Sequence, residues 1–414
     1  MISCVVSAPA DTYSGYGKRS VDFIKELIKN SDWSVKILSQ RWGNTRMGYL
    51  EDHGESDLIS RIIPNLEEKP DVWIQITVPN EFQPVGKFNI GVTAGVETTL
   101  CDISWINGCN RMDLVVASSE LGKQSMYNPI YRDQTGREIK AETPCEVLFE
   151  GIDTSRYFSN PKRTEVLQDL KNSWNFLVVG HWLQGNVGED RKNIPMTIRY
   201  FLEAFKDRGE RAPGLVIKTS RCIASELDKE DILTRICEIR DSVQYKKSLP
   251  NVYLLHGDLT DAEMNEVYND PRIMAMVTFT KGEGFGRPLV EFVTTGKPII
   301  ASAWSGYRDV LLESNSMFIG GKIKQVHPSA VQDGIILPQA SWFTVDPQQA
   351  IAGLKDVYIN YGRWRAAAEK EKQYVLTNFT LDHMGEKIKN LIVQRAEKSI
   401  TEMPKEPEFI KIES

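Results

Sequence analysis

The sequence has few cysteines, no long apolar run and no excess of positive charge. Its six cysteines are scattered and form no Cys-x-x-Cys pair, which indicates reduced, mostly buried thiols rather than a disulfide framework or a zinc site. No apolar run approaches the ~18–20 residues that a membrane-spanning helix needs. The first twenty residues lack the basic and apolar segments of a signal peptide. We therefore expect an intracellular, cytoplasmic protein.

Positive charge is slightly outnumbered. The 50 lysines and arginines against 56 aspartates and glutamates give a formal net charge of −6. Nucleic-acid-binding domains are usually basic, so this balance does not indicate such a partner, although it leaves room for a local basic patch. With 41% hydrophobic and 26% charged residues, the 414-residue chain has the composition of a soluble globular protein of two or three domains.

Short apolar runs alternate with helical patterns in two series. They lie at 2–7, 35–38, 72–78, 89–92 and 114–117, and then at 176–179, 215–218, 252–255, 273–279 and 298–301. This alternation is typical of an α/β protein with parallel sheets and crossover helices. The polar segment 153–172 between the two series is the predicted hinge. We predict two Rossmann-like domains, over 1–158 and 165–380, that face each other across a cleft.

The most informative stretch begins at Phe279. An apolar strand leads into the glycine-rich loop 282–286, and Pro288 then suits the first turn of a helix. Glycines let backbone N–H groups approach a ligand closely, and a helix N-terminus favours anionic groups. Glu283 in the loop would face a sugar. Glu291 would lie about two helical turns deeper, where its carboxylate could accept hydrogen bonds from a ribose diol.

This stretch resembles the Glu-x7-Glu motif of retaining glycosyltransferases with the GT-B fold, especially those of family 4. The matching residues are Glu283, Gly284, Phe285, Gly286, Pro288, Glu291, Gly296 and Pro298. The resemblance implies that Glu283 contacts the donor sugar and Glu291 holds the nucleotide ribose. It also implies that the loop Gly284-Phe285-Gly286 offers backbone contacts to the sugar hydroxyls. Phe292 and Thr294 replace small residues of the family.

The start of the second domain also resembles the family. Arg191 and Lys192 fall where the family has cations that pair with the donor diphosphate, and fixed cations suit that task. His181 stands where the family has Arg. Lys218 ends a predicted strand. Its side chain either contacts a phosphate of the donor or lies in solvent at the strand end. The segment around Leu259 resembles the family segment that surrounds the nucleotide base. This resemblance implies that backbone groups at Leu259 contact the edge of the base.

The first domain matches more loosely. Gly15 and Gly17 resemble the family's first glycine loop, which lies beside the donor phosphates. The family often has a His after a middle strand of this domain. The corresponding loop here has none, and Glu97 is the best polar candidate for that acceptor-side place, with capping of the core as the alternative. Segment 147–158 resembles the family's Pro-Asn-Gly-Val-Asp turn, with Glu150 in place of the Asn.

The resemblance covers about residues 1–400 and implies a retaining transfer from a nucleoside-diphosphate sugar, most commonly a UDP-sugar. It implies no essential metal and no other cofactor, because basic residues stabilise the leaving diphosphate. It also implies a C-terminal helix, about 381–400, that packs back on the first domain. Residues 403–414 are predicted to form a polar tail. We expect a monomer or a dimer.

Three alternatives remain open. The blocks 180–193 and 92–116 resemble glycosyltransferases of large tailed phages. Some of these enzymes glycosylate hydroxymethylated bases, such as hydroxymethylcytosine in duplex DNA, in the host cytoplasm. Such an acceptor would need a basic strip at the cleft, for which the candidates are Arg41, Arg46, Lys123, Arg132, Arg137 and Lys140. A nucleotide-sugar epimerase or a phosphorylase is the second alternative. A non-catalytic nucleotide-sugar-binding protein is the third.

Overall fold

The first series of apolar runs folds into one parallel sheet. A computed structural model describes residues 1–221 and 225–403. The sheet has the strand order β2-β1-β3-β4-β5-β8, and all its pairings are parallel. Its strands are β1 (Ser3–Ala8), β2 (Ser34–Ser39), β3 (Val72–Ile76), β4 (Phe88–Thr93), β5 (Leu114–Ala117) and β8 (Cys145–Val147). Its helices are α1 (Gly15–Lys29), α2 (Tyr49–Asp52), α3 (Ser56–Ser60), α4 (Ile103–Cys109) and α5 (Glu120–Tyr127).

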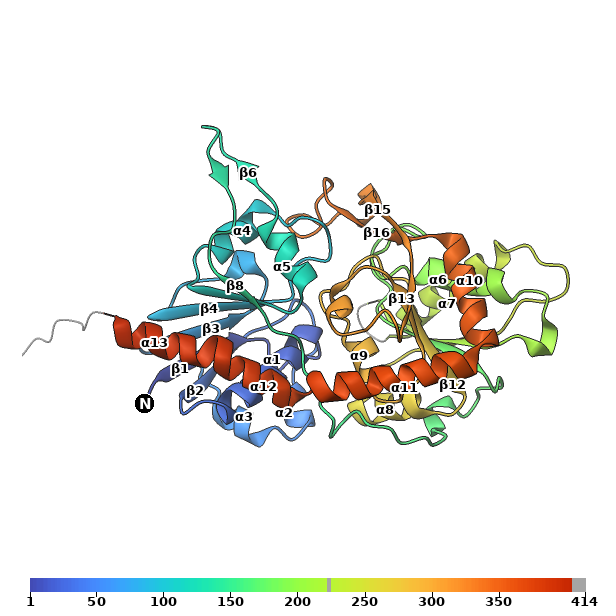
Figure 1. Cartoon of the computed structure of the whole chain (residues 1–414), viewed down its shortest axis with the longest axis horizontal. Helices are drawn as coiled ribbons and strands as arrows, with labels where there is room; N and C mark the ends of the chain where they lie inside the picture. The colour runs from blue at the N-terminus through green and yellow to red at the C-terminus, as the bar shows by residue number, and fades with distance from the viewer. Residues whose placement is uncertain (222–224, 404–414) are drawn as a thin grey trace, which may run out of the picture.

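The second series forms a second parallel sheet, which lies beside the first in Figure 1. Its strand order is β11-β10-β9-β12-β13-β14. The strands are β9 (Asn175–Val179), β10 (Gly214–Lys218), β11 (Val252–Leu255), β12 (Ile273–Thr278), β13 (Ile299–Ser302) and β14 (Met317–Ile319). The helices are α6 (Ile194–Phe205), α7 (Glu226–Asp241), α8 (Asp261–Asn269), α9 (Arg287–Val293), α10 (Pro347–Ile359) and α11 (Tyr361–Asn378). The two sheets confirm the predicted pair of Rossmann-like folds.

Two short hairpins lie outside the sheets, and the sequence patterns did not predict them. One pairs β6 (Tyr131–Arg132) with β7 (Glu138–Ile139), and it projects from the first domain in Figure 1. The other pairs β15 (Gly321–Gln325) with β16 (Ser341–Val345). The strands β8 and β14 at the sheet edges were also missed, because runs of three residues give no periodic signal.

The last helices that the structure describes lie on the first domain. α12 (Leu381–Ile388), a π-helical turn at Lys389–Val393 and α13 (Gln394–Glu402) run along it in Figure 1. Trp33 donates from its indole to Glu397 at 3.0 Å, and Arg395 pairs with Glu146 at 3.3 Å. Of the predicted polar tail 403–414, only Met403 lies within the described residues. None of the described helices has the length and hydropathy to span a bilayer.

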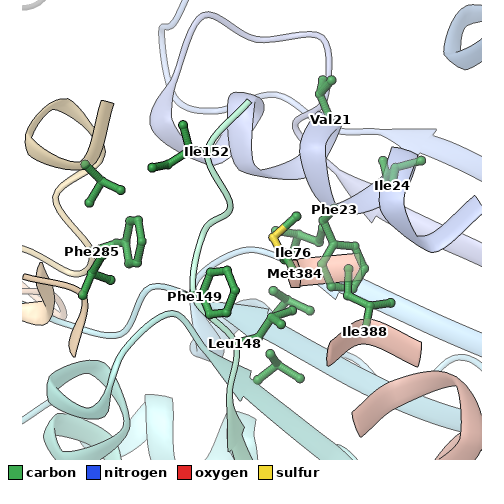
Figure 2. Packing of buried hydrophobic residues seen from close by; sticks show 14 of the residues in the cluster. Val21, Phe23, Ile24, Ile76, Leu148, Phe149, Ile152, Phe285, Met384 and Ile388 are labelled. Atoms are coloured by element: carbon green, nitrogen blue, oxygen red, sulfur yellow. The ribbon is translucent and has the colours of Figure 1, made fainter. Parts of the chain in front are cut away.

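The two chain crossings between the domains lie together. The N–H of Ile152 donates to the carbonyl of Phe379 at 2.9 Å, and the N–H of Leu381 donates to Ile152 at 3.0 Å. One buried apolar cluster continues from the first domain through this region into the second. Figure 2 shows the place, with the side chains of Phe23, Leu148, Phe149, Met384 and Ile388. The predicted hinge segment 153–172 begins at this crossing and lies along α8. It donates hydrogen bonds to Asp261, Asn265 and Asn269 of that helix.

Candidate active site

Both sheets place a strand-order reversal at the cleft. In the second sheet the order reverses between β9 and β12, and in the first between β1 and β3. Ligands of open parallel sheets bind at such points, beyond the carboxyl ends of the strands, because the loops diverge there and leave a crevice. The loop after β9 carries Arg191 and Lys192, and the loop after β12 carries Glu283. The loop after β1 leads into Gly15 and Gly17 in the first turn of α1.

Hydrogen bonds join the loops after β9 and β12. Lys281 donates its backbone N–H to the carbonyl of Arg191 at 2.7 Å, and the side-chain amide of Asn193 donates to the carbonyl of Phe279 at 3.0 Å. Asn193 has φ of 55°, a left-handed conformation that Asn tolerates better than most residues. It also opens helix α6, so Lys192 stands directly before a helix N-terminus. The two loops therefore hold their charged side chains at fixed positions.

Glu283 is the centre of the charged cluster. Its carboxylate accepts a hydrogen bond from the Lys192 ammonium and lies 3.7 Å from the Arg191 guanidinium. Burial alone would raise the pKa of Glu283, but Lys192 and Arg191 outweigh it and hold the pKa below its ordinary value. Glu283 is therefore ionised at neutral pH.

Arg191 links the cluster to the opposite domain. Its Nη1 lies 2.9 Å from Oε1 of Glu97 and donates to the carbonyl of Gly282 at 2.8 Å. Glu97 follows β4, so its carboxylate reaches the cleft from the first domain. This placement brings together the four side chains that the sequence singles out for chemistry: Glu97, Arg191, Lys192 and Glu283.

The glycine-rich loop fits closely against the first domain. A Cβ on Gly282 would stand 2.3 Å from the carbonyl of Glu97, and one on Gly284 would stand 3.1 Å from the carbonyl of Ala94. Ser119 donates its hydroxyl to the carbonyl of Gly284 at 2.6 Å, in addition to capping α5. Only a loop without side chains at these positions lets the two domains approach so closely.

Phe285 and Gly286 lie deeper in the loop. Phe285 is 4% exposed, and Figure 2 shows its ring on the side of the segment that carries Phe149 and Ile152. Gly286 has φ of 94°, which glycine adopts without a steric penalty. Both residues can therefore offer backbone groups to a ligand, but the Phe285 ring serves packing.

Glu291 lies in α9, within the second domain's half of the cleft. It accepts a hydrogen bond from the Tyr268 hydroxyl at 3.2 Å and lies 3.7 Å from Nε of Arg287. Burial raises the pKa of Glu291, and the charges of Lys18 and Arg287 offset it only in part. A hydroxyl donor placed beside it would satisfy the buried carboxylate, because buried acceptors need hydrogen-bond partners.

The first glycine loop opens helix α1. Ser14 caps the helix by accepting from the N–H of Gly17 at 2.9 Å. A Cβ on Gly17 would stand 2.1 Å from the carbonyl of Thr12, whereas one on Gly15 would meet nothing within 4 Å. Gly17 is therefore needed for the turn, and Gly15 leaves open space beside the first N–H groups of α1. Such N–H groups and the helix dipole attract anions.

The remaining predicted donor residues lie at or after the ends of β9, β10 and β11. His181 is exposed, with Nδ1 3.3 Å from the Ser220 hydroxyl. Desolvation by the surrounding protein, followed by the charge of Lys192, lowers the pKa of His181, so its ring is neutral at neutral pH. Burial lowers the pKa of Lys218 at the end of β10. Leu259 is half-buried and precedes Thr260, the N-cap of α8.

Two ion-pair groups across the cleft escaped sequence analysis. Arg287, the variable residue of the Glu-x7-Glu motif, pairs with Asp22 at 2.9 Å and with Glu150 at 3.2 Å. Lys18, directly after the first glycine loop, pairs with Asp261 of α8. Glu150 stands where the family has Asn, and the positive charge of Arg287 explains that departure. The sequence offered one indication of this pair: Glu150 adds an acid in the first domain, and Arg287 adds a cation in the second.

The predicted basic strip is partly neutralised. Arg46 pairs with Asp52 at 2.6 Å and lies over the Tyr13 ring, and Arg132 pairs with Glu138 at 3.1 Å. Arg41, Arg137 and Lys140 are exposed, and Lys123 is half-buried.

Comparison with known proteins identifies the fold. No family model and no curated protein sequence matches the chain. Among solved structures, HepE of Anabaena in complex with UDP and glucose has a TM-score of 0.65 at 12% identity, over 95% of this chain and all of that one. Sucrose-phosphate synthase of Thermosynechococcus elongatus has a TM-score of 0.63 at 10% identity, over 96% and 99% of the two chains.

A third solved structure is WaaG, a glycosyltransferase involved in lipopolysaccharide biosynthesis. Its TM-score is 0.55 at 14% identity, over 94% of this chain and 99% of that one. These full-length likenesses confirm the GT-B fold that the sequence predicted.

Proposed function

We propose that this protein is a glycosyltransferase that moves a sugar from a nucleoside-diphosphate sugar to an acceptor hydroxyl, with a UDP-sugar as donor. The observation that carries the proposal is the meeting of Arg191, Lys192 and Glu283 at the strand-order reversal of the second sheet. The likeness to HepE structures that contain UDP and UDP-glucose supports the choice of donor.

The donor would lie across the cleft with its anionic part between the domains. The diphosphate would meet the first turn of α1 beside Gly15 on one side and Arg191 and Lys192 on the other. Both elements suit a phosphate, the helix through its N–H groups and dipole and the side chains through charge-assisted hydrogen bonds. The ribose hydroxyls would donate to Glu291, whose buried carboxylate has acceptor capacity beyond the Tyr268 hydroxyl.

The reaction would break the bond between the sugar's anomeric carbon and the β-phosphate oxygen. Negative charge grows on that oxygen, and Arg191 and Lys192 are already positioned to stabilise it. The acceptor oxygen bonds to the anomeric carbon on the face that the phosphate leaves, so that the configuration is retained. Its proton passes to the departing phosphate. The Glu283 carboxylate would stabilise positive charge on the sugar.

The pairing of Lys192 with Glu283 prepares the site for this exchange. A diphosphate is a stronger partner for Lys192 than one carboxylate, so donor binding would draw the ammonium towards phosphate and leave Glu283 for the sugar. The cations needed for the leaving group come from the chain itself, and the proposal therefore requires no metal. Close packing of the glycine-rich loop against Ala94 and Glu97 would keep water from the anomeric carbon.

The test is release of nucleoside diphosphate from a panel of nucleotide sugars, with and without duplex DNA that contains hydroxymethylcytosine. We expect turnover of a UDP-sugar, and a loss of about 100-fold or more in Lys192→Ala because a fixed cation at the leaving group is removed. Lys229→Ala is the matched control, since Lys229 pairs with Glu226 on the surface of α7. No turnover with any donor would contradict the proposal, and glycosylated DNA would identify the DNA acceptor.

A further inference from the structure

A cavity of about 560 Å³ opens between the domains, beside the candidate active site. Leu100, Asp102, Ile130 and Tyr131 line it from the first domain, and Leu337 and Gln339 line it from the second. Its volume falls within the ~300–1,000 Å³ of ligand pockets. The cavity forms only where the two domains meet.

The second-domain wall is the segment 326–340, which joins β15 to β16 and which we call the cleft arm. The arm reaches the first domain: Trp105 donates from its indole to the carbonyl of Gly334 at 3.1 Å. Just beyond the arm, Thr99 donates its N–H to Ser341 at 2.8 Å, and Ser341 donates its N–H to the Thr99 hydroxyl at 2.9 Å. The buried arm residue Ala340 and its neighbour Trp342 belong to an apolar cluster against which Leu100 packs. The cavity wall is therefore fixed to both domains.

The cavity lies next to the reacting groups on the side of the first domain. Thr99, which lines it, is two residues from Glu97, and two residues span at most ~7 Å. Glu97 in turn contacts Arg191, the neighbour of Glu283. A molecule in the cavity would therefore lie close to Glu97 and to the charged cluster around Glu283.

The residues that line the cavity disfavour an anionic ligand. None of the described residues that line the cavity is lysine, arginine or histidine, and Asp102 contributes a carboxylate. Thr99, Asn128, Tyr131 and Gln339 add hydroxyl and amide groups between apolar faces. The adjacent hairpin of β6 and β7 carries Arg132 and Arg137 against Asp133 and Glu138, so its charges cancel. Polyphosphate chains need cations along their path, and the described residues that line the cavity include none.

We propose that this cavity binds a neutral oligosaccharide, which supplies the acceptor hydroxyl. Sugar rings present hydroxyl edges and apolar C–H faces, and the alternation of polar and apolar groups in the lining fits both. The inference rests on the proposed function, because it assigns the second substrate of the same site.

The experiment is binding of the full chain, with UDP present, to an array of neutral glycans, anionic glycans and hydroxymethylcytosine-containing duplex DNA. Ile130→Glu places a charge in the lining at a side chain that is 58% exposed, so that folding tolerates it. Ile335→Glu is the matched control: it lies in the cleft arm, is 44% exposed and does not line the cavity. Thermal melting of each variant checks its fold.

We expect retention on a subset of neutral glycans, a loss of tenfold or more in Ile130→Glu and no change in Ile335→Glu. Absence of any neutral glycan ligand, retention on DNA or anionic glycans instead, or equal retention by Ile130→Glu would overturn the inference. UDP-sugar turnover without acceptor is measured in parallel. Failure of the proposed function appears there as an inert donor site, whereas failure of this inference leaves donor turnover intact.

Discussion

At the residue scale, the proposed chemistry depends on the charge balance around Glu283. The cleft brings two cations, Arg191 and Lys192, against two carboxylates, Glu97 and Glu283. Removing one partner of a buried ion pair destabilises the fold by more than the intact pair stabilises it, because the remaining charge is left buried without a partner. In the free protein these groups compensate one another. With a diphosphate bound, Arg191 and Lys192 would pair with the phosphates instead of with Glu97 and Glu283.

Glu283→Gln tests the role of the carboxylate, because it keeps the shape of the side chain and removes its charge. We expect turnover of the donor to fall by about 100-fold or more, since an electrostatic contact to the developing charge is lost. UDP should bind as tightly as before, or more tightly, because a negative charge near the diphosphate has gone. Steady-state kinetics and calorimetric titration of UDP measure the two effects.

Glu313→Gln is the control for that substitution, because Glu313 is a surface carboxylate whose side chain is 80% exposed. It should leave both turnover and UDP binding at wild-type values. Wild-type turnover in Glu283→Gln would remove the carboxylate from the mechanism.

At the element scale, the site is a set of loops held by strand ends and helix starts. The turn before α1 depends on Gly17, because a Cβ there would stand 2.1 Å from the carbonyl of Thr12. Gly15 occupies the same turn with open space around it, so the two glycines have different tasks. One permits the backbone to turn, and the other keeps the helix N-terminus accessible.

Gly17→Ala should therefore destabilise the protein, by about 1–3 kcal/mol as overpacked sites do. Gly15→Ala should change the free energy of unfolding by less than ~0.5 kcal/mol, as substitutions away from tight contacts do. Urea denaturation of both variants measures the difference. Equal stability of the two variants would show that the backbone at Thr12 yields to a Cβ and that the turn is not tightly packed.

Elements were predictable from sequence where the signal is local. The strand–loop–helix pattern around Glu283 and Glu291 is contained in about twenty residues, and Leu114–Ala117 was predicted with the bounds that β5 has. The pairs of Lys18 with Asp261 and of Arg287 with Asp22 join residues 243 and 265 positions apart. No periodicity reports such contacts. The cleft arm was missed for the same reason, since its partners Thr99 and Trp105 lie in the other domain.

At the scale of the whole molecule, ion pairs hold the cleft closed. Arg287 of the second domain contacts Asp22 and Glu150 of the first, and Asp261 receives Lys18 and Arg156. The glycine-rich loop packs against Glu97 where the domains meet, so binding of the proposed donor would be connected to domain position through the same residues. The two chain crossings at Ile152 and Phe379 lie together and are the natural axis for opening.

Arg287→Ala should open the cleft and lower stability, because it leaves Asp22, Glu150 and Glu291 without their shared cation. Loss of one partner of a buried ion pair costs about 3–5 kcal/mol. Arg235→Ala, which removes a surface pair with Asp231, should cost less than ~0.5 kcal/mol. Urea denaturation gives the cost, and small-angle X-ray scattering should show a larger radius of gyration for Arg287→Ala alone. Equal results for the two variants would contradict the role of Arg287 in closure.

Asp261 gives closure a dependence on pH. Burial would raise its pKa, but Lys18, Tyr157 and Arg156 outweigh burial and lower the pKa to about 2. A carboxyl with a lowered pKa stabilises the fold above its unfolded pKa of about 3.9, and this contribution fades as the pH falls towards 2. The difference in unfolding free energy between wild type and Asp261→Asn should therefore be full at pH 7 and shrink below about pH 4. A difference that stays constant down to pH 3 would contradict the assignment.

The most direct test of the proposed donor site is a crystal structure of the protein with UDP bound. We predict the diphosphate between the first turn of α1 and the side chains of Arg191 and Lys192, with the ribose hydroxyls on Glu291 and the Lys192–Glu283 contact lengthened. UDP bound elsewhere, or bound in the cleft with Glu291 still directed only at Tyr268 and Arg287, would contradict the proposed donor site.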